Sequence, residues 1–146
     1  MIYANCKKLN DLAIIPTKGS IDAAGYDLYA AIEEPITIAP YTVEKIGTGL
    51  AFSFPNTIFA GIYARSGWAT NRGLRPANCV GVCDADYRGE YIVALYNDSS
   101  DDQVVNPGDR IAQLVFHNVP QVSILSFETE LDETERGDGG FGSTGE

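Results

Sequence analysis

Hydrophobic residues recur along this chain in short segments, and proline, glycine, asparagine or aspartate separates many of them. Several segments alternate apolar and polar residues, and others are short continuous apolar runs, as β-strands do. The segments that predict strands are residues 22–30, 36–38, 42–50, 51–55, 58–64, 79–84, 90–96, 110–116 and 119–127. About ten short strands at close spacing predict an all-β double sheet or jelly roll.

Residues 65–73, RSGWATNRG, interrupt the strand pattern and predict one helix of about two turns. Ser66 is a suitable N-cap, and Gly73 is a suitable residue to end the helix. The free N–H groups of the first turn, with Arg65 beside them, favour an anion near Ser66. A plain capped helix is the alternative, because a Ser-Gly pair alone is a weak signal.

Residues 78–91, NCVGVCDADYRGEY, form the most distinctive segment of the chain. We interpret them as a β-hairpin in which strand 79–84 is followed by the turn residues 86–89 and by strand 90–96. Asp84 stands where the apolar strand meets the turn, and a carboxylate there is costly to bury. We therefore treat Asp84 as a candidate functional residue, with a turn-capping role as the alternative.

Two polar residues within predicted strands are further candidates. Asp27 lies on the opposite face of its strand from Tyr26, Leu28 and Ala30, and a solvated strand acid is the alternative interpretation. Gln113 lies inside the apolar strand 110–116 and needs a hydrogen-bond partner, which is either a ligand or neighbouring backbone.

From Leu131 onwards the chain has no apolar periodicity, and five of its last ten residues are glycine. We expect residues 1–132 to form the β domain and residues 133–146 to form a mobile C-terminal arm. Arginine, hydroxyl groups and bending glycine backbone suit phosphate, and a lone aromatic ring suits stacking on a planar ligand. The residues concerned are Arg136, Phe141, Ser143 and Thr144, and a simply disordered tail is the alternative.

The length, net charge and apolar runs of the chain limit the kinds of molecule that it is expected to bind. The 146 residues suffice for one domain, and 20 acidic against 10 basic residues give a net charge of −10. This charge argues against a nucleic-acid binder, whereas a small anionic ligand remains possible if arginines, backbone N–H groups and a divalent cation offset the field. No apolar run approaches the length of a membrane span, and the N-terminus lacks the hydrophobic block of a signal peptide. We therefore expect a cytoplasmic protein without a membrane partner.

The three cysteines are Cys6, Cys79 and Cys83, and the only histidine is His117. If Cys79 and Cys83 share an extended strand, they lie about 13 Å apart, too far for a disulfide. A zinc site is also not expected, because the chain has a single histidine and no second pair of cysteines. We expect all three cysteines to pack as small hydrophobic residues.

Five motifs, in order along the chain, resemble those of the trimeric dUTP diphosphatase (dUTPase) family. They are AAGYDLYA at 23–30, ARSGWAT at 64–70, GVCDADYRGEY at 81–91, PGDRIAQLVF at 107–116 and RGDGGFGSTG at 136–145. The resemblance implies a jelly-roll-like (β-clip) subunit, a homotrimer with three sites shared between chains, and hydrolysis of dUTP to dUMP and diphosphate. It also implies Mg²⁺ held through substrate phosphates and water. The reaction limits uracil incorporation into DNA and supplies dUMP for thymidylate synthesis.

Two alternatives on the same scaffold stay open. One is a dCTP deaminase-type enzyme, which would need a glutamate placed to deaminate cytosine. The other is a non-catalytic trimeric protein that binds nucleotides or signals.

Carried over by motif, the resemblance implies that Asp84 holds and activates the attacking water and meets the deoxyribose 3′-hydroxyl. Tyr87 would lie against the sugar and leave no room for a 2′-hydroxyl. Asn78 and the backbone around Gly81 would bind the uracil edge.

The remaining motifs would bind phosphate. Arg65, Ser66 and Gly67 would bind the phosphate chain, and Gln113 would reach a phosphate oxygen. Asp27 and Arg110 would support the site through ion pairing.

In the tail, Arg136, Ser143 and Thr144 would bind the distal phosphates, Phe141 would stack on uracil, and Gly142 belongs to the same substrate-binding motif. Three residues depart from the usual family pattern: Trp68, Cys83 and Asp138.

Overall fold

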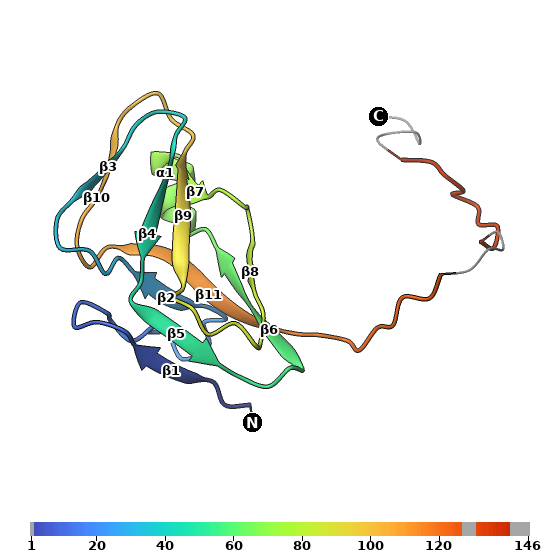
Figure 1. Ribbon diagram of the computed structural model, residues 1–146. Coiled ribbons are helices and arrows are strands. Elements are labelled where there is room, and N and C mark those ends of the chain that lie inside the picture. Colours follow the sequence, from blue (N-terminus) through green and yellow to red (C-terminus); the bar gives the residue numbers. More distant parts are fainter. Residues whose placement is uncertain (1, 127–130, 141–146) are drawn as a thin grey trace.

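The computed structural model describes residues 2–126 and 131–140, and this part of the chain forms eleven short strands and one helix (Figure 1). The strands are β1 (Asn5–Lys8), β2 (Tyr26–Tyr29), β3 (Ile36–Ile38), β4 (Val43–Gly47), β5 (Leu50–Ser53), β6 (Ile58–Tyr63), β7 (Leu74–Pro76), β8 (Gly81–Cys83), β9 (Ile92–Asn97), β10 (Gln103–Val105) and β11 (Arg110–Asn118). The helix α1 is Ser66–Arg72. The predicted all-β, jelly-roll-like architecture with a single short helix is confirmed.

The strands form four antiparallel sheets. The largest has the order β2-β11-β6-β8, and a three-stranded sheet has the order β4-β9-β7. Strand β1 pairs with β5, and β10 pairs with β3. Neighbours within each sheet are mostly distant in sequence, so residues from far apart in the chain meet at the strand ends.

One hydrophobic core joins the two larger sheets. Leu28, Ile62 and Leu114 from the first sheet share it with Ile46 and Leu95 from the second. Leu28 and Leu95 are completely buried, and burying such a side chain contributes about 1.5–3 kcal/mol. The predicted alternation holds for β2, where Leu28 faces this core and Asp27 faces the opposite side.

Most predicted strands are present, with shifted bounds. The predicted strand 42–50 is interrupted, because the left-handed Gly49 (φ 64°) turns the chain from β4 into β5. Strands β1, β7 and β10 were not predicted, since each is only three or four residues long and lacks an apolar period.

The predicted hairpin over residues 78–91 is wrong. Strand β8 covers only Gly81–Cys83 and pairs with β6, whereas β9 begins at Ile92 and pairs with β4 and β7. The segment between them connects two sheets. Cys79 adopts a left-handed conformation (φ 60°) in the turn before β8, so it lies outside the strand.

The predicted last strand, residues 119–127, is also wrong where the structure describes it, because residues 119–126 contain no strand; residue 127 lies outside the described part. The side chains of Val122, Ile124 and Leu125 are largely exposed. The apolar alternation is present there, but β11 ends at Asn118, and no strand in the described part of the chain pairs with residues 119–126.

The helix is present as predicted, but its N-cap is Arg65 and no side chain caps it. The Ser66 N-cap is therefore wrong by one position, whereas Gly73 ends the helix in the left-handed conformation (φ 68°), as predicted. All three cysteines are free thiols. Cys6 and Cys83 pack against the core as expected, but Cys79 is exposed.

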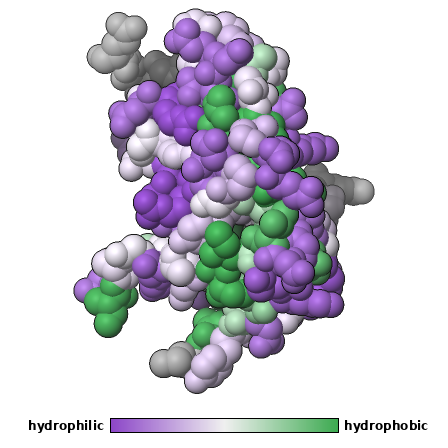
Figure 2. Space-filling model, turned by 90° about the vertical axis from the view of Figure 1, so that its left-hand side faces the viewer, coloured by the Kyte–Doolittle hydropathy of each residue, from purple (hydrophilic) through white to green (hydrophobic). Residues whose placement is uncertain are grey.

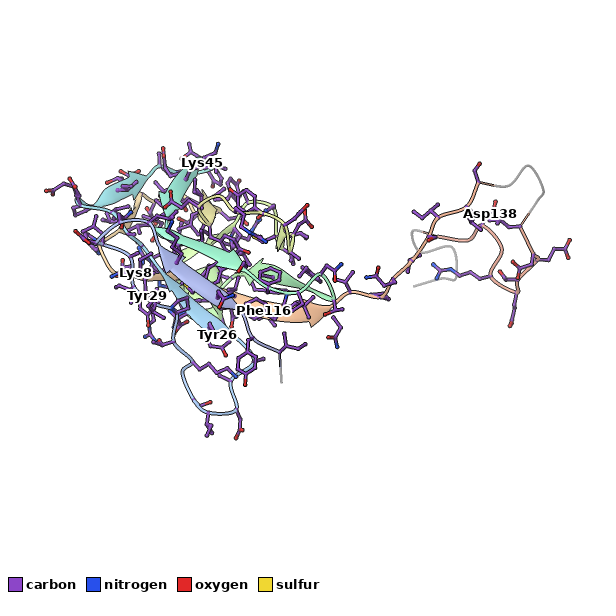
Figure 3. The ribbon with its side chains drawn as sticks, turned by 60° about the horizontal axis from the view of Figure 1, so that its bottom comes forward. Lys8, Tyr26, Tyr29, Lys45, Phe116 and Asp138 are labelled. Carbon is purple, nitrogen blue, oxygen red and sulfur yellow. The ribbon has the colours of Figure 1, made fainter. Side chains whose placement is uncertain are left out.

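Residues 131–140 lie away from the strands, as the position of Asp138 in Figure 3 shows. Within the largest sheet, by contrast, Tyr26 of β2 and Phe116 of the neighbouring strand β11 pack edge to face. Within 131–140 the hydrogen bonds are local turns, such as Gly137 N–H to the Thr134 carbonyl oxygen at 3.1 Å. No helix in the described ranges is long and apolar enough to cross a membrane. Figure 2 shows hydrophobic side chains gathered mainly in the lower half of one face, at the level of β1 and β2 in Figure 1.

Candidate active site

An ion-pair corner forms where β2, β11 and the start of α1 meet. The Arg65 Nε atom donates to Asp27 Oδ1 at 2.8 Å, and Arg110 Nη1 donates to Asp27 Oδ2 at 3.2 Å. The Asp27 side chain is only 14% exposed, whereas that of Arg110 is 52% exposed. One largely buried carboxylate thus orients two arginines, and part of the Arg110 charge remains open to solvent.

Gln113 completes this corner. Its Nε2 atom donates to the Ala64 carbonyl oxygen at 2.9 Å, so the backbone alternative for its partner is present. A Cβ atom at Gly25 would lie 2.7 Å from Gln113 Oε1, so a side chain at position 25 would displace this amide from its present place. The amide oxygen makes no hydrogen bond within the described residues and can accept one from a ligand or water.

The first turn of α1 adjoins the corner. Ser66 and Gly67 are exposed, and no atom lies within 4 Å of a Cβ built on Gly67. The first N–H groups of any helix lack partners within the helix. Arg65, Ser66, Gly67, Gln113, Asp27 and Arg110 are therefore brought together as an open, positively charged corner.

A second group of predicted residues lies at the turn before β8. The Asn78 Nδ2 atom is 3.2 Å from the position of a Cβ on Gly81, so Asn78 and Gly81 are neighbours. Val80 N–H donates to the Asn78 carbonyl oxygen at 2.6 Å, which closes the turn. Asn78 is exposed, and its amide can both donate and accept hydrogen bonds.

Asp84 and Tyr87 belong to the same group, directly after β8. The Asp84 carbonyl oxygen accepts a hydrogen bond from Tyr87 N–H at 3.2 Å, while the carboxylate is exposed. The Tyr87 ring is 46% exposed, and its hydroxyl donates to the Glu90 carbonyl oxygen at 3.1 Å. A free carboxylate and a fixed aromatic ring are thus presented by one turn.

Burial dominates the electrostatics beneath this turn. It raises the pKa of the Cys83 thiol, the Tyr91 hydroxyl lowers that pKa in part, and the Asp84 charge raises it further. Burial likewise raises the pKa of Tyr91 well above the ordinary range of tyrosine. Cys83 is therefore a neutral thiol at neutral pH and not a nucleophile.

Asp84 lies apart from the ion-pair corner along strand β6, whereas Gly81 pairs with Ile62 close to the corner's end of that strand. At its C-terminal end, residue Ala64 contacts the corner, whereas Cys83, which precedes Asp84, pairs with Ala60. Four residues of extended strand span about 13 Å. Within one chain, Asp84 and the corner therefore lie toward opposite ends of β6.

The structure does not bring the tail to either group. Arg136 is exposed and its Nε atom donates to the Gly139 carbonyl oxygen at 2.9 Å, within the tail itself. Phe141, Gly142, Ser143 and Thr144 lie outside the described residues. Two of the residues that depart from the usual family pattern are placed as follows. The Trp68 ring lies under the Arg72 guanidinium group, with 4.4 Å from the guanidinium carbon to the ring centroid. Asp138 lies in the tail.

In residues 2–126 and 131–140, no group of three or more histidine, cysteine, aspartate or glutamate side chains is placed to hold a metal ion.

Two residues that contact the Tyr87 ring, Gly89 and Tyr91, were not among the predicted site residues. The only signal in the sequence was that both residues lie within four positions of Tyr87. A tyrosine next to an apolar strand is more typical of a core residue, so this signal did not indicate a role in the site.

The two open groups, one cationic and one that presents an exposed carboxylate and an aromatic ring on the same turn, define a candidate site for a phosphorylated planar ligand. A family model described as dUTPase matches residues 11–145, and the chain belongs to this family.

The deoxyuridine 5′-triphosphate nucleotidohydrolase of Desulfitobacterium hafniense is 48% identical over 90% of this chain and 87% of its own length. That of Rickettsia bellii is 46% identical over 95% and 93%. Among solved structures, the dUTPase of Staphylococcus bacteriophage 80alpha with dUPNHPP is 25% identical, has a TM-score of 0.83 and covers 98% of both chains.

Proposed function

We propose that this protein hydrolyses dUTP to dUMP and diphosphate. The observation that carries the proposal is that one turn presents the exposed Asp84 and the fixed Tyr87 ring, on a chain that belongs to the dUTPase family. Asp84 can act as the general base that accepts a proton from water, and the Tyr87 ring can pack against the sugar. The reaction needs these two elements in addition to phosphate binding.

In the proposed reaction, Asp84 accepts a proton from a water that attacks the α-phosphorus. The bond from the α-phosphorus to the oxygen that bridges to the β-phosphorus breaks, and diphosphate leaves with the bonding electrons. Arg65, the N–H groups at Ser66 and Gly67, and Gln113 bind the phosphate chain. Positioning provides most of the rate, because phosphoryl chemistry requires little covalent work from the protein.

Asn78 and the backbone at Gly81 bind the uracil edge, and Tyr87 lies against the deoxyribose. Asp27 and Arg110 hold Arg65 in place, which is supported by the two hydrogen bonds at the Asp27 carboxylate. The tail residues Arg136, Phe141, Gly142, Ser143 and Thr144 close over the bound nucleotide and exclude water, so residues 133–146 act as a mobile arm.

We further propose a homotrimer in which different copies supply the two groups of one site. The separation of Asp84 from the ion-pair corner along β6 supports this, since one triphosphate has to reach both. The exposed Val122, Ile124 and Leu125 side chains also support a second copy, because burial of apolar surface drives association.

Mg²⁺ is the proposed metal. The described residues offer no protein cage, whereas Mg²⁺ readily binds triphosphate oxygens and retains waters, so the substrate would hold most of it. When bound, it neutralises charge on the phosphates. The protein groups nearest to this chemistry are Asp84 and the phosphate-binding corner.

We place the protein in the cytoplasm, where it limits uracil in DNA and supplies dUMP for thymidylate synthesis. Neither nucleic acid nor membrane is a proposed partner, and the net charge of −10 disfavours the first.

The direct test is diphosphate release from dUTP, with dTTP, dCTP and UTP in parallel and with or without Mg²⁺. We expect release from dUTP alone, strongly increased by Mg²⁺. Ammonia release from dCTP would instead identify a deaminase, and binding of dUTP without any release would identify a nucleotide-binding protein.

A further inference from the structure

The Tyr87 ring rests on two residues for which neither the motifs nor the comparisons give a role. A Cβ atom at Gly89 would collide with the Tyr87 hydroxyl and would lie 2.6 Å from ring carbon Cζ. Real Cβ atoms do not approach other atoms so closely, so the ring occupies space that exists only because residue 89 is glycine. The centroid of the Tyr87 ring also lies 6.0 Å from that of Tyr91, at 32° between the ring planes.

Tyr91 is itself held rigidly. It is 1% exposed and packs against Phe52 at 4.6 Å between ring centroids. Its N–H donates to the Leu50 carbonyl oxygen at 2.8 Å, and the Thr48 hydroxyl donates to the Tyr91 carbonyl oxygen at 2.6 Å. Three bonds, including one from Thr48 N–H at 3.2 Å, thus fix Tyr91 to the turn between β4 and β5.

Glu90 adds to the same anchor. Gly49 N–H donates to Glu90 Oε1 at 2.8 Å, and the Glu90 carbonyl oxygen accepts the Tyr87 hydroxyl. The position of the Tyr87 ring is therefore determined by Gly89, Glu90 and Tyr91 together, and Glu90 and Tyr91 are hydrogen-bonded to residues 48–50 at the β4–β5 turn.

The Tyr91 hydroxyl does not explain why a tyrosine stands here. Among the described residues, the Tyr91 hydroxyl is the one buried side-chain oxygen or nitrogen without a hydrogen-bond partner. The nearby Cys83 thiol is at most a weak hydrogen-bond partner for it. A buried hydroxyl without a partner is unfavourable, so the ring, and not the hydroxyl, is the part of Tyr91 that benefits the protein.

We propose that Tyr91 and Gly89 are positioning residues for sugar selectivity: they hold the Tyr87 ring against the ribose and thereby exclude nucleotides with a 2′-hydroxyl. The inference rests on the proposed function, in which Tyr87 contacts the sugar. A ring that tilts or retreats by a fraction of an ångström would admit the extra oxygen atom of UTP. The loss of either support should therefore relax discrimination between dUTP and UTP.

The test measures kcat/KM for dUTP and UTP in the full chain, with Mg²⁺, for wild type and four variants. Tyr91→Leu removes the ring support but stays apolar, and Gly89→Ala displaces the Tyr87 ring by adding a methyl group in contact with it. We expect the dUTP-to-UTP ratio to fall about tenfold or more in both. Tyr91→Phe keeps the ring and should retain the wild-type ratio within about twofold.

Phe52→Leu is the matched control. Phe52 packs on Tyr91 but forms no ring pair with Tyr87 among the described residues, so this variant should lower the melting temperature and leave the ratio unchanged. Equal losses of the ratio in Phe52→Leu and Tyr91→Leu would show that Tyr91 is merely structural and would overturn the proposal. So would an unchanged ratio in folded Gly89→Ala.

If Tyr91→Leu does not fold, Gly89→Ala and Tyr91→Phe still decide the question. The failure of the proposed function is distinguishable, because wild-type protein would then release no diphosphate from dUTP at all. Wild-type hydrolysis with strong selectivity, together with unaltered selectivity in the variants, would refute only the role of Tyr91 and Gly89.

Discussion

The ion-pair corner and the turn after β8 hold their functional groups in different ways. In the corner, side chains from β2, β11 and the start of α1 hold one another through charged hydrogen bonds at Asp27. In the turn, the Asp84 side chain is exposed, and Tyr87 is positioned by packing and by backbone hydrogen bonds. The groups that we propose bind the phosphate chain are thus oriented before substrate arrives, whereas the carboxylate that we propose acts on water is exposed.

The comparison predicts that changes in the turn lower turnover or selectivity, whereas changes in the corner weaken binding. The largest effect should come from Asp84→Asn. The amide keeps the shape but cannot accept a proton from water, so we expect kcat to fall by about 10²–10⁴-fold. dUTP affinity, measured calorimetrically with a non-hydrolysable analogue, should stay close to wild type; a variant with undiminished kcat would exclude Asp84 as the base.

Removal of residues 137–146 should have the next largest effect. The tail makes only local hydrogen bonds where it is described, so the fold should keep its melting temperature. Turnover should fall by about 10²-fold, because closure over the nucleotide is lost. Undiminished turnover of a folded truncated protein would contradict an active role of the tail.

Asp27→Asn should have a moderate effect on the corner. Arg65 and Arg110 would lose their shared carboxylate, and we expect KM for dUTP to rise about tenfold with little change in kcat. The matched control is Asp98→Asn, which removes the exposed Arg75–Asp98 pair (3.6 Å) and should leave KM unchanged. A fall in kcat at constant KM would assign Asp27 a different role.

The smallest effect concerns stability at alkaline pH. Burial favours the neutral forms of Cys83 and Tyr91 and raises both pKa values in the folded state. Their contribution to stability is complete below the unfolded pKa values, about 8.5 and 10, and decreases as pH rises above them. Thermal unfolding between pH 7.5 and 10.5 should show this decrease, and the double variant Cys83→Ala with Tyr91→Phe should show less of it; an equal decrease in both proteins would contradict the prediction.

Much of the fold and of the corner could be predicted from the sequence. The alternation in β2 placed Asp27 opposite Leu28, and the misfit of Gln113 in an apolar strand indicated a specific partner, which is Ala64. Both signals depend on residues within regular strands, where the side-chain period determines the face.

The segment 78–91 could be predicted less well, for a physical reason. Its apolar residues pack against partners distant in sequence, so the pattern of a hairpin conceals a connection between two sheets. The prediction for residues 119–126 failed similarly, because their alternation has no pairing strand within the described part of the chain. Local pattern predicts the type of a segment, while pairing is decided by the whole fold or by another copy.

The most direct test of the shared site is complementation between two impaired variants, assayed at a dUTP concentration well below the wild-type KM, where weakened binding also lowers the rate. Asp84→Asn and Arg65→Gln damage different groups, so mixed oligomers, formed by co-refolding equal amounts, should contain some sites with both groups intact. With random mixing the chance is one half for each group, and we predict about a quarter of the wild-type rate of diphosphate release from dUTP. A rate no greater than the average of the two separate variants would contradict a site assembled from different copies.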